Sequence, residues 1–218
     1  MSENKFVKER NKKLGIKTVE AFKKRHFDAY FCNDRAEALN TVLSHISKDD
    51  VIAWGGSTTM AELGLADYLE NNGYKTINRD KAPDAEAKRK CAYDSFLADV
   101  FLMSANAISE DGQLVNIDGL GNRVAALAFG PKKVIVVAGM NKVVKNLEEA
   151  YTRARTYAAP CNLQRIASVA DNKTPCAVTG TCGDCLSPDS ICCQIITTRL
   201  CRPAGRIVVI LVNEELGY

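Results

Sequence analysis

VIAWGGSTT, residues 51–59, is a short apolar run that stops at two glycines and then enters a hydroxyl-rich turn. An apolar-periodic stretch follows it to about residue 72, so the order predicts a strand, a tight glycine turn and a helix. KVIVVAG, residues 133–139, repeats the pattern of a buried strand that ends at a glycine. Two such units predict parallel strands, because a parallel pair needs a helical crossover between its members.

The same alternation extends outward in both directions. Further strands are predicted over 27–32, 75–78, 100–107, 114–117 and 206–212, and further helices over 4–26, 34–43, 83–93, 124–128 and 143–157. The turn-forming residues 110–113 predict a hairpin between 100–107 and 114–117. We expect one α/β domain over residues 27–218, with a mostly parallel sheet flanked by helices, preceded by an N-terminal helix over residues 1–26.

Composition and charge exclude several classes of protein. The chain has 218 residues, of which 46% are hydrophobic and 25% charged, which excludes disordered, collagen-like and coiled-coil proteins. Residues 1–25 carry nine basic and three acidic side chains, a net charge of +6, which leaves −3 on the rest. We interpret the basic helix as a solvated helix packed by one face, and nucleic-acid binding as the least favoured function. Without a signal peptide or an apolar run of about 20 residues, the expectation is a cytoplasmic protein with no membrane partner.

Two glycine turns are candidates for binding an anion. Strand-to-helix turns at the carboxyl ends of parallel strands present backbone N–H groups and a helix dipole to a ligand. The residues expected there are Gly55, Gly56, Ser57, Thr58 and Thr59 in the first turn, and Asn141 and Lys142 in the second. A merely structural role for each turn is an equal alternative, since neither matches the P-loop or dinucleotide-binding pattern.

Three longer stretches together resemble one known family. They are WGGSTTMAELGL at 54–65, DGQLVNIDGLGNRVAALAFGPKKVIVVAGMNKVV at 111–144 and PCAVTGTCGDCLSPDSICC at 175–193. They resemble the LUD-domain (lactate utilisation, DUF162) family, in a stand-alone form that adds a C-terminal cysteine cluster. The resemblance implies a fold of the NagB/RpiA/CoA-transferase-like type. It also implies an association with lactate oxidation in bacteria and archaea, beside iron–sulfur partner proteins.

Polar residues of the family-like stretches supply the remaining candidates for the pocket. Those expected to line it are Asp111, Asn116, Asp118, Asn122 and Arg123. We expect Arg123 or Lys142 to meet an anionic ligand, because a guanidinium or ammonium group suits carboxylate and phosphate. Glu62, one turn into the helix after the first glycine turn, is a candidate general acid or base. The alternatives are ordinary turn, capping and surface roles.

Six of the nine cysteines crowd the end of the chain, within residues 175–201, a segment that we treat as an insertion in the domain. Four of them have the spacing Cys176-x5-Cys182-x2-Cys185-x6-Cys192, and Cys193 or Cys201 could replace the last ligand. Only one pair has the short CxxC spacing of zinc knuckles, so a [4Fe–4S] cluster is favoured over zinc, with free thiols as a third possibility. The scattered Cys32, Cys91 and Cys161 are expected to be small core residues.

Together these patterns predict an iron–sulfur LUD-domain protein that binds a small anionic metabolite and takes part in lactate or related hydroxy-acid metabolism. Three cluster ligands would leave an open iron, as in a lyase, whereas four would fit a redox subunit that works beside iron–sulfur partner proteins. The alternative is a non-catalytic module, stapled by zinc or a cluster, that acts as a structural or redox subunit of a complex. A homodimer is the default oligomer.

Overall fold

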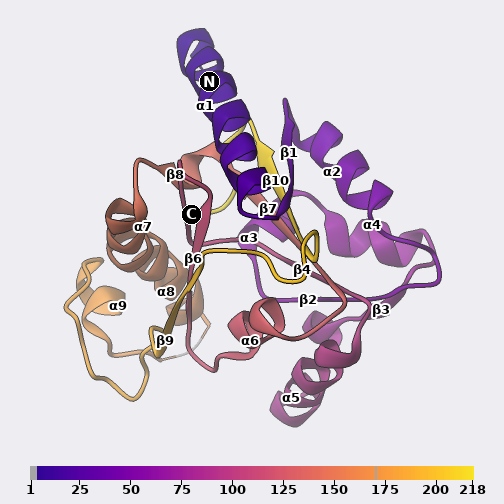
Figure 1. Ribbon diagram of the computed structural model, residues 1–218. Helices are drawn as coiled ribbons and strands as arrows, with labels where there is room; N and C mark the ends of the chain where they lie inside the picture. Colours follow the sequence, from indigo (N-terminus) through magenta and orange to yellow (C-terminus); the bar gives the residue numbers. More distant parts are fainter. Residues whose placement is uncertain (1–3, 170) are drawn as a thin grey trace.

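A six-stranded, entirely parallel sheet forms the centre of the computed structural model, which describes residues 4–169 and 171–218 (Figure 1). The strands lie in the order β1-β10-β7-β4-β2-β3. Their bounds are β1 Asp28–Cys32, β2 Val51–Trp54, β3 Lys75–Ile77, β4 Val100–Met103, β7 Lys133–Gly139 and β10 Ile207–Val212. The expected parallel sheet is confirmed, and the last apolar run returns to its middle, between β1 and β7.

A second sheet packs beside the first, and the sequence predicted only its central hairpin. Its strands, in the order β8-β5-β6-β9, are β8 Val143–Val144, β5 Ala107–Ser109, β6 Gln113–Asp118 and β9 Gln194–Thr198. The expected hairpin exists as β5 and β6, but the prediction of one strand over 100–107 is wrong, because 100–103 belongs to the main sheet. The chain leaves the main sheet at Asn106, whose side-chain carbonyl accepts a hydrogen bond from the N–H of Ile117 at 3.0 Å.

Nine α-helices connect the strands within the described residues. They are α1 Lys5–Lys24, α2 Arg35–Ser44, α3 Thr58–Glu62, α4 Leu65–Asn71, α5 Ala85–Asp94, α6 Asn122–Ala128, α7 Leu147–Arg153, α8 Ala159–Ala167 and α9 Pro175–Thr179. Asp34 caps α2, since its carboxylate accepts a hydrogen bond from the N–H of Glu37 at 2.9 Å. The predicted helix after the first glycine turn is interrupted at Gly64, whose φ of 62° ends α3 and starts α4.

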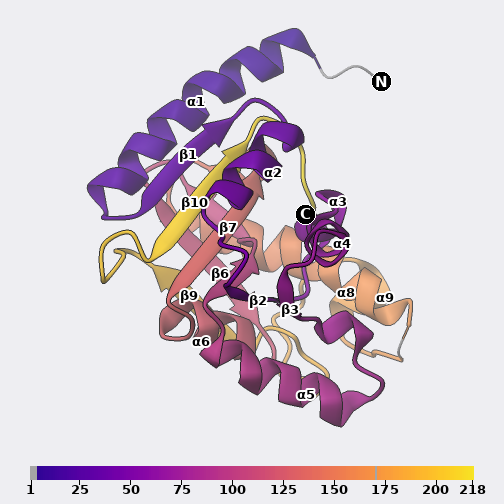
Figure 2. The same cartoon turned by 90° about the vertical axis from the view of Figure 1, so that its right-hand side faces the viewer.

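Helices and strands form successive layers around three hydrophobic cores. Buried side chains of α2, α3 and α4 pack on one face of the main sheet, and those of α1, α6, β5 and β6 pack on the other. Alanines of α7 and α8 cover the outer face of the second sheet. Figure 2 shows α1 running along β1 and β10, with α8 and α9 on the far side of the second sheet. The second sheet therefore lies between the main sheet and the layer of α7 and α8.

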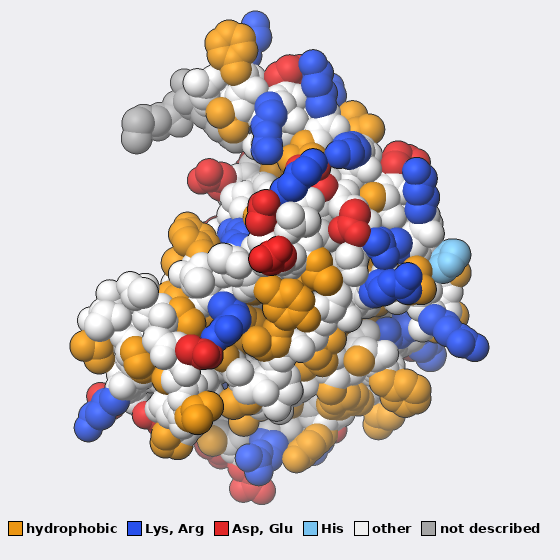
Figure 3. Space-filling model, turned by 60° about the vertical axis from the view of Figure 1, so that its left-hand side comes forward, with side chains coloured by type: hydrophobic (Ala, Val, Ile, Leu, Met, Phe, Trp, Pro, Cys, Tyr) orange, Lys and Arg blue, Asp and Glu red, His pale blue; other side chains and the backbone are white. Residues whose placement is uncertain are grey.

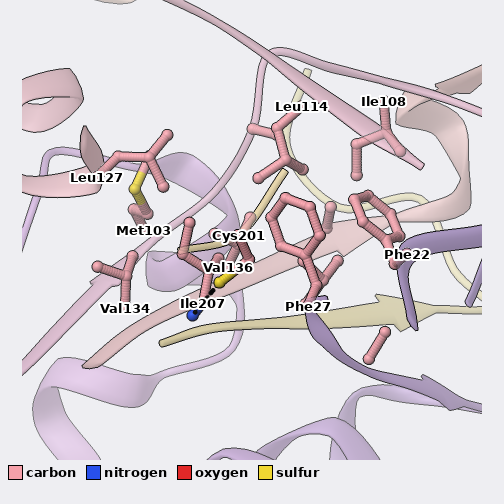
Figure 4. Close-up of a cluster of buried hydrophobic side chains, with 14 of the residues drawn as sticks. Phe22, Phe27, Met103, Ile108, Leu114, Leu127, Val134, Val136, Cys201 and Ile207 are labelled. Carbon is pink, nitrogen blue, oxygen red and sulfur yellow. Dashed lines mark hydrogen bonds between the residues drawn. The ribbon is translucent and has the colours of Figure 1, made fainter. Parts of the chain in front are cut away.

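The core between α1 and the main sheet is aromatic at its centre (Figure 4). The rings of Phe22 and Phe27 meet edge to face, with centroids 5.2 Å apart. Cys201 is also buried there, and its sulfur accepts a hydrogen bond from the N–H of Ile207 at 3.3 Å. Cys201, which the sequence offered as an alternative last metal ligand, is therefore a core residue, as is Cys32.

The chain from α7 to α8 is one continuous helix that widens in its middle. Residues Ala154–Ala158 form a π-helical turn directly before Pro160, which lies in the first turn of α8. A proline inside a helix lacks one N–H and clashes with the carbonyl four residues earlier, and the wider turn accommodates both effects. The predicted helix 143–157 thus begins later, at Leu147, and extends further.

Helix α1 presents its basic side chains to solvent. Figure 3 shows Lys and Arg side chains gathered over this helix at the top of the molecule. Its opposite face buries Thr18, Val19 and Phe22, as expected of an amphipathic helix packed by one face. Among the described residues, none of the helices is both long and apolar enough to cross a bilayer.

We predict that Phe22→Ala lowers the free energy of unfolding by about 3–5 kcal/mol, because it opens a cavity under α1. Phe22 is fully buried, whereas Phe6 on the same helix is 80% exposed. Phe6→Ala is therefore the matched control and should change stability by less than about 0.5 kcal/mol. Urea unfolding followed by circular dichroism measures both variants, and equal stabilities would show that α1 is not part of the core.

Candidate functional site

A cavity of about 270 Å³ opens at the carboxyl edge of the main sheet. Its walls come from the segments that follow β2, β4, β6 and β7, from α8, and from residues 217–218. The lining residues are Gly56, Ser57, Thr58, Thr59, Arg79, Ser104, Ala105, Asn106, Ile117, Asp118, Gly119, Leu120, Asn122, Arg123, Lys142, Ala159, Asn162, Arg165, Ile166, Ile191, Gly217 and Tyr218. The two predicted glycine turns therefore meet at one site, as parallel strands require.

Lys142 is the most unusual group in this cavity. Its side chain is buried, and Nζ donates hydrogen bonds of 3.0 Å to the hydroxyls of Thr59 and Ser104. Burial, together with the positive charges of Arg153 and Arg123, lowers the pKa of the ammonium from 10.5 to about 7. The described residues provide no carboxylate in an ion pair with it, so near neutral pH this amine is poised to gain or lose a proton.

The side chain of Arg123 is 14% exposed, and both of its terminal nitrogens are already hydrogen-bonded within the protein. One terminal nitrogen donates to the carbonyl of Ser104 and the side chain of Asn116, both at 3.1 Å. The other donates to the side chain of Asn106 at 3.0 Å and to the carbonyl of Ile117 at 2.5 Å. Its role in the structure is to fix the walls of the cavity, while its charge acts on neighbouring groups.

Two arginines that the sequence analysis missed line the cavity with less complete partnerships. The Nε of Arg79 is buried and finds no hydrogen-bond partner among the described residues. Arg165 contacts the side chain of Asn162 and the hydroxyl of Tyr218, both neutral groups. Arg79 follows the end of β3, and this position just after a strand is a sequence signal that could have identified it as a site residue. Arg165 has no such signal in the sequence, because the π-helical turn sets which face of α8 it occupies.

The hydroxyls of the first glycine turn have three different roles. Ser57 caps α3, since its oxygen accepts a hydrogen bond from the N–H of Met60 at 3.4 Å. Thr59 holds Lys142 and donates to the carbonyl of Leu216 at 3.3 Å. The hydroxyl of Thr58 is buried and has no partner within the described part of the chain, so it is available to a ligand. Gly55 lies behind the turn, where a Cβ would meet Arg123 Cδ at 3.0 Å.

Three further predicted residues lie close to Arg123: Asp118, Asn122 and Asn116. The Asp118 carboxylate accepts hydrogen bonds from the N–H groups of Arg123 and Val124 at 3.0 and 3.2 Å, and thereby caps α6. Asn122, the first residue of α6, lines the cavity. Asn116 is fully buried, and its side-chain nitrogen has no hydrogen-bond partner in the described structure.

Five predicted residues do not line the cavity: Gly55 and Asn116, described above, and Asp111, Glu62 and Asn141. Asp111 lies in the β5–β6 turn, where its carboxylate pairs with Arg25 at 2.6 Å. Glu62 accepts a hydrogen bond from the N–H of Gly217 at 2.8 Å, and its charge favours the protonated form of Lys142. Asn141 donates to the carbonyl of Gly217 at 3.0 Å. Glu62 and Asn141 thus hold the segment that crosses the site.

The cysteine segment brings four thiols into one neighbourhood. Burial, together with the nearby thiols of Cys176, Cys182 and Cys185, raises the pKa of Cys192 to about 11. Arg155, which pairs with the Asp184 carboxylate, has the opposite effect. Within residues 4–169 and 171–218, however, no three His, Cys, Asp or Glu side chains are arranged to hold a metal ion.

The other cysteines have different surroundings. Cys193 is exposed, and its thiol contacts the carbonyl of Ser190 at 3.4 Å. Cys91 on α5 and Cys161 on α8 are half-buried.

The cysteine segment and the cavity share walls. Ile191, directly before Cys192, lines the cavity, and its backbone lies 3.3 Å from the position of a Cβ at Gly119. On α8, Gln164 donates to the carbonyl of Cys176 at 2.8 Å, while its neighbour Arg165 faces the cavity. Along the chain, Cys192 is therefore the direct neighbour of a residue in the cavity wall.

The sequence pattern that defines the LUD domain matches residues 16–212. The chain belongs to the LUD-domain family. This LUD domain is also similar in fold to a DUF162 family protein from Deinococcus radiodurans, with a TM-score of 0.53 and 13% sequence identity over 93% of this chain and 97% of that chain. Ribose 5-phosphate isomerase A from Methanocaldococcus jannaschii matches with a TM-score of 0.34 and 16% identity over 62% of this chain and 65% of that one. A comparison with curated proteins gives no match.

We predict that the buried amine makes stability depend on pH. Between about pH 7, the pKa of folded Lys142, and the ordinary value of 10.5, the unfolded chain binds a proton that the folded LUD domain does not. The free energy of unfolding therefore rises with pH in this window, by up to about 1.4 kcal/mol per pH unit, and Lys142→Met should remove that rise. Denaturant unfolding of both proteins at several pH values measures the difference, and parallel pH profiles would contradict it.

Proposed function

We propose that this LUD domain binds a small anionic metabolite, a hydroxy acid of the lactate type, in the cavity at the carboxyl edge of the main sheet. One observation carries the proposal: four cationic side chains line the cavity, and Asp118 is the one acidic side chain among its described lining residues. The cations are Arg79, Arg123, Lys142 and Arg165. Lys142 is buried, Arg79 and Arg123 are partly buried, and Arg165 is exposed. Positive charges that outnumber carboxylates in one cavity favour an anionic ligand.

The unsatisfied groups suit a carboxylate with a neighbouring hydroxyl. Arg165, whose partners are neutral, and the unpaired Nε of Arg79 would bind the carboxylate. The free hydroxyl of Thr58 would hydrogen-bond to the ligand. Lys142, with a pKa of about 7, would then accept or return the proton of the ligand's hydroxyl group at Nζ.

We further propose that Cys176, Cys182, Cys185 and Cys192 hold a [4Fe–4S] cluster beside this cavity. The observations in favour are their spacing and the electrostatic effect that the first three thiols have on the fourth. Cys193 has no such effect on Cys192 and faces solvent, so it is not assigned as a ligand. A bound cluster supplies one-electron transfer, or Lewis acidity if one iron is open.

The short path from Cys192 through Ile191 to the cavity favours a redox or lytic role in hydroxy-acid metabolism over a distant structural staple. In the redox form of the proposal, the four cysteines would hold a cluster that supplies one-electron transfer toward iron–sulfur partner proteins.

Replacing Arg165 tests the metabolite site. Arg165→Met should weaken binding of L-lactate about 10- to 100-fold, because it removes a charged hydrogen bond to the carboxylate. The matched control is Lys132→Gln, an exposed lysine paired with Asp99 away from the cavity, which should bind L-lactate as the wild type does. Isothermal titration calorimetry measures all three proteins. Equal affinities of wild type and Arg165→Met, or no binding by either, would reject L-lactate as the ligand of this site.

Metal analysis of protein purified without oxygen tests the cluster. The wild type should be brown, with about four iron atoms and four sulfides per chain. Single Cys→Ala changes at 176, 182, 185 and 192 should lower the iron content, whereas Cys193→Ala and Cys91→Ala, both outside the proposed ligand set, should not. A colourless protein with one zinc ion per chain would overturn the iron–sulfur assignment.

A further inference from the structure

A second and larger cavity, of about 810 Å³, lies between α5 and α6. Both helices are neighbours at the bottom of the molecule in Figures 1 and 2. The cavity exists because the facing side chains are small: Ala85 and Ala92 on α5 and Ala125 on α6 all line it. Every residue of α5 is at least partly exposed, so this helix does not fill the space against the body of the protein. The volume suits a ligand larger than a hydroxy acid.

The inner wall of this cavity is aromatic. Trp54 and Phe101, both buried, lie at its base, with Phe96 beside them and Tyr93, which is 64% exposed, at the rim. The indole N–H of Trp54 is bonded to the Asp80 carboxylate at 2.9 Å, so its ring is held in place. Rigid aromatic faces of this kind are surfaces on which a planar heteroaromatic ring stacks.

The outer wall is basic. Lys88 and Arg89 on α5 line the cavity, and neither forms an ion pair in the described structure. Arg79 lines it as well, with its Nε unpartnered and 3.9 Å from the Asp80 carboxylate, too far for a hydrogen bond. Against these three cations, Glu86 is the one acidic side chain among the described lining residues. Charge complementarity therefore favours a ligand with phosphate groups.

The two cavities are neighbours and share one wall. Arg79, Leu120 and Asn122 line both of them, and the Arg79 guanidinium lies about 3.8 Å from the position of a Cβ at Gly56 in the first glycine turn. A phosphate group bound at Arg79 would thus stand at the entrance of the hydroxy-acid cavity.

We propose that the cavity between α5 and α6 binds a nucleotide, with its base against Trp54 and Phe101 and its phosphates at Lys88, Arg89 and Arg79. This site goes beyond the proposed hydroxy-acid and cluster functions and requires neither of them.

Trp54 is the only tryptophan of the chain and provides the readout. ADP should quench its fluorescence saturably, with excitation at the red edge of the indole band where adenine does not absorb. Adenosine, which lacks phosphate, and inorganic phosphate, which lacks the base, should each bind at least about tenfold more weakly, since each keeps one half of the contacts. Calorimetry on the same full-length protein checks each affinity.

Substitutions on α5 separate the two cavities. Ala92→Leu fills the second cavity and should weaken ADP at least about tenfold while leaving L-lactate binding unchanged. Lys88→Gln should weaken ADP but not adenosine. The matched control is Lys90→Gln on the same helix, whose lysine pairs with Asp94 outside the cavity, and it should bind ADP as the wild type does.

Two results would overturn the nucleotide site. One is the absence of both quenching and binding heat with ADP in the wild type. The other is ADP binding that Ala92→Leu and Lys88→Gln leave unchanged and that L-lactate displaces, which would place ADP in the first cavity. The second result would reject the nucleotide site and retain the anion site. If ADP binds as predicted but L-lactate does not bind, the hydroxy-acid proposal is rejected and the nucleotide site is retained.

Discussion

The burial of one guanidinium joins the two sheets and shapes the site between them. Arg123 reaches from α6 to acceptors that follow β4 and to acceptors within β6, so the main sheet and the second sheet are held at a fixed separation. Gly55 suits the same arrangement, because a Cβ there would lie 3.0 Å from Arg123 Cδ and press on the arginine. The cavity is therefore largely pre-formed, and its walls do not depend on a ligand to assemble.

The charges behind those walls would couple binding of the proposed anion to protonation. Arg123 and Arg153 repel a proton on Lys142, and burial adds to this effect, so the amine holds its proton weakly in the free protein. An anion placed among these groups offsets the repulsion and strengthens the hold on the proton. Binding and proton uptake at Lys142 are thus two aspects of one electrostatic balance.

Sequence patterns predicted the main sheet and the meeting of its two glycine turns, because long apolar runs and glycine breaks are local signals. They could not show that 100–107 divides between two sheets, since both parts are apolar and the division depends on the partner of Asn106. β9, within the cysteine-rich end of the chain, was missed because its pairing with β6 is a long-range contact. Arg123 was expected to meet a ligand, and only tertiary structure shows that its hydrogen bonds are already used.

The π-helical turn before Pro160 also fixes the rotation of everything that follows it. Successive residues of an α-helix point about 100° apart, so a helix that lost one residue from the widened turn would present α8 rotated by that angle. Gln164, which supports the cysteine segment, and Arg165, which lines the cavity, are sequence neighbours on this helix. One extra residue in a single helical turn therefore determines that Gln164 faces the cysteine segment and Arg165 faces the cavity. The extra residue fixes the rotation of α8 that both contacts need.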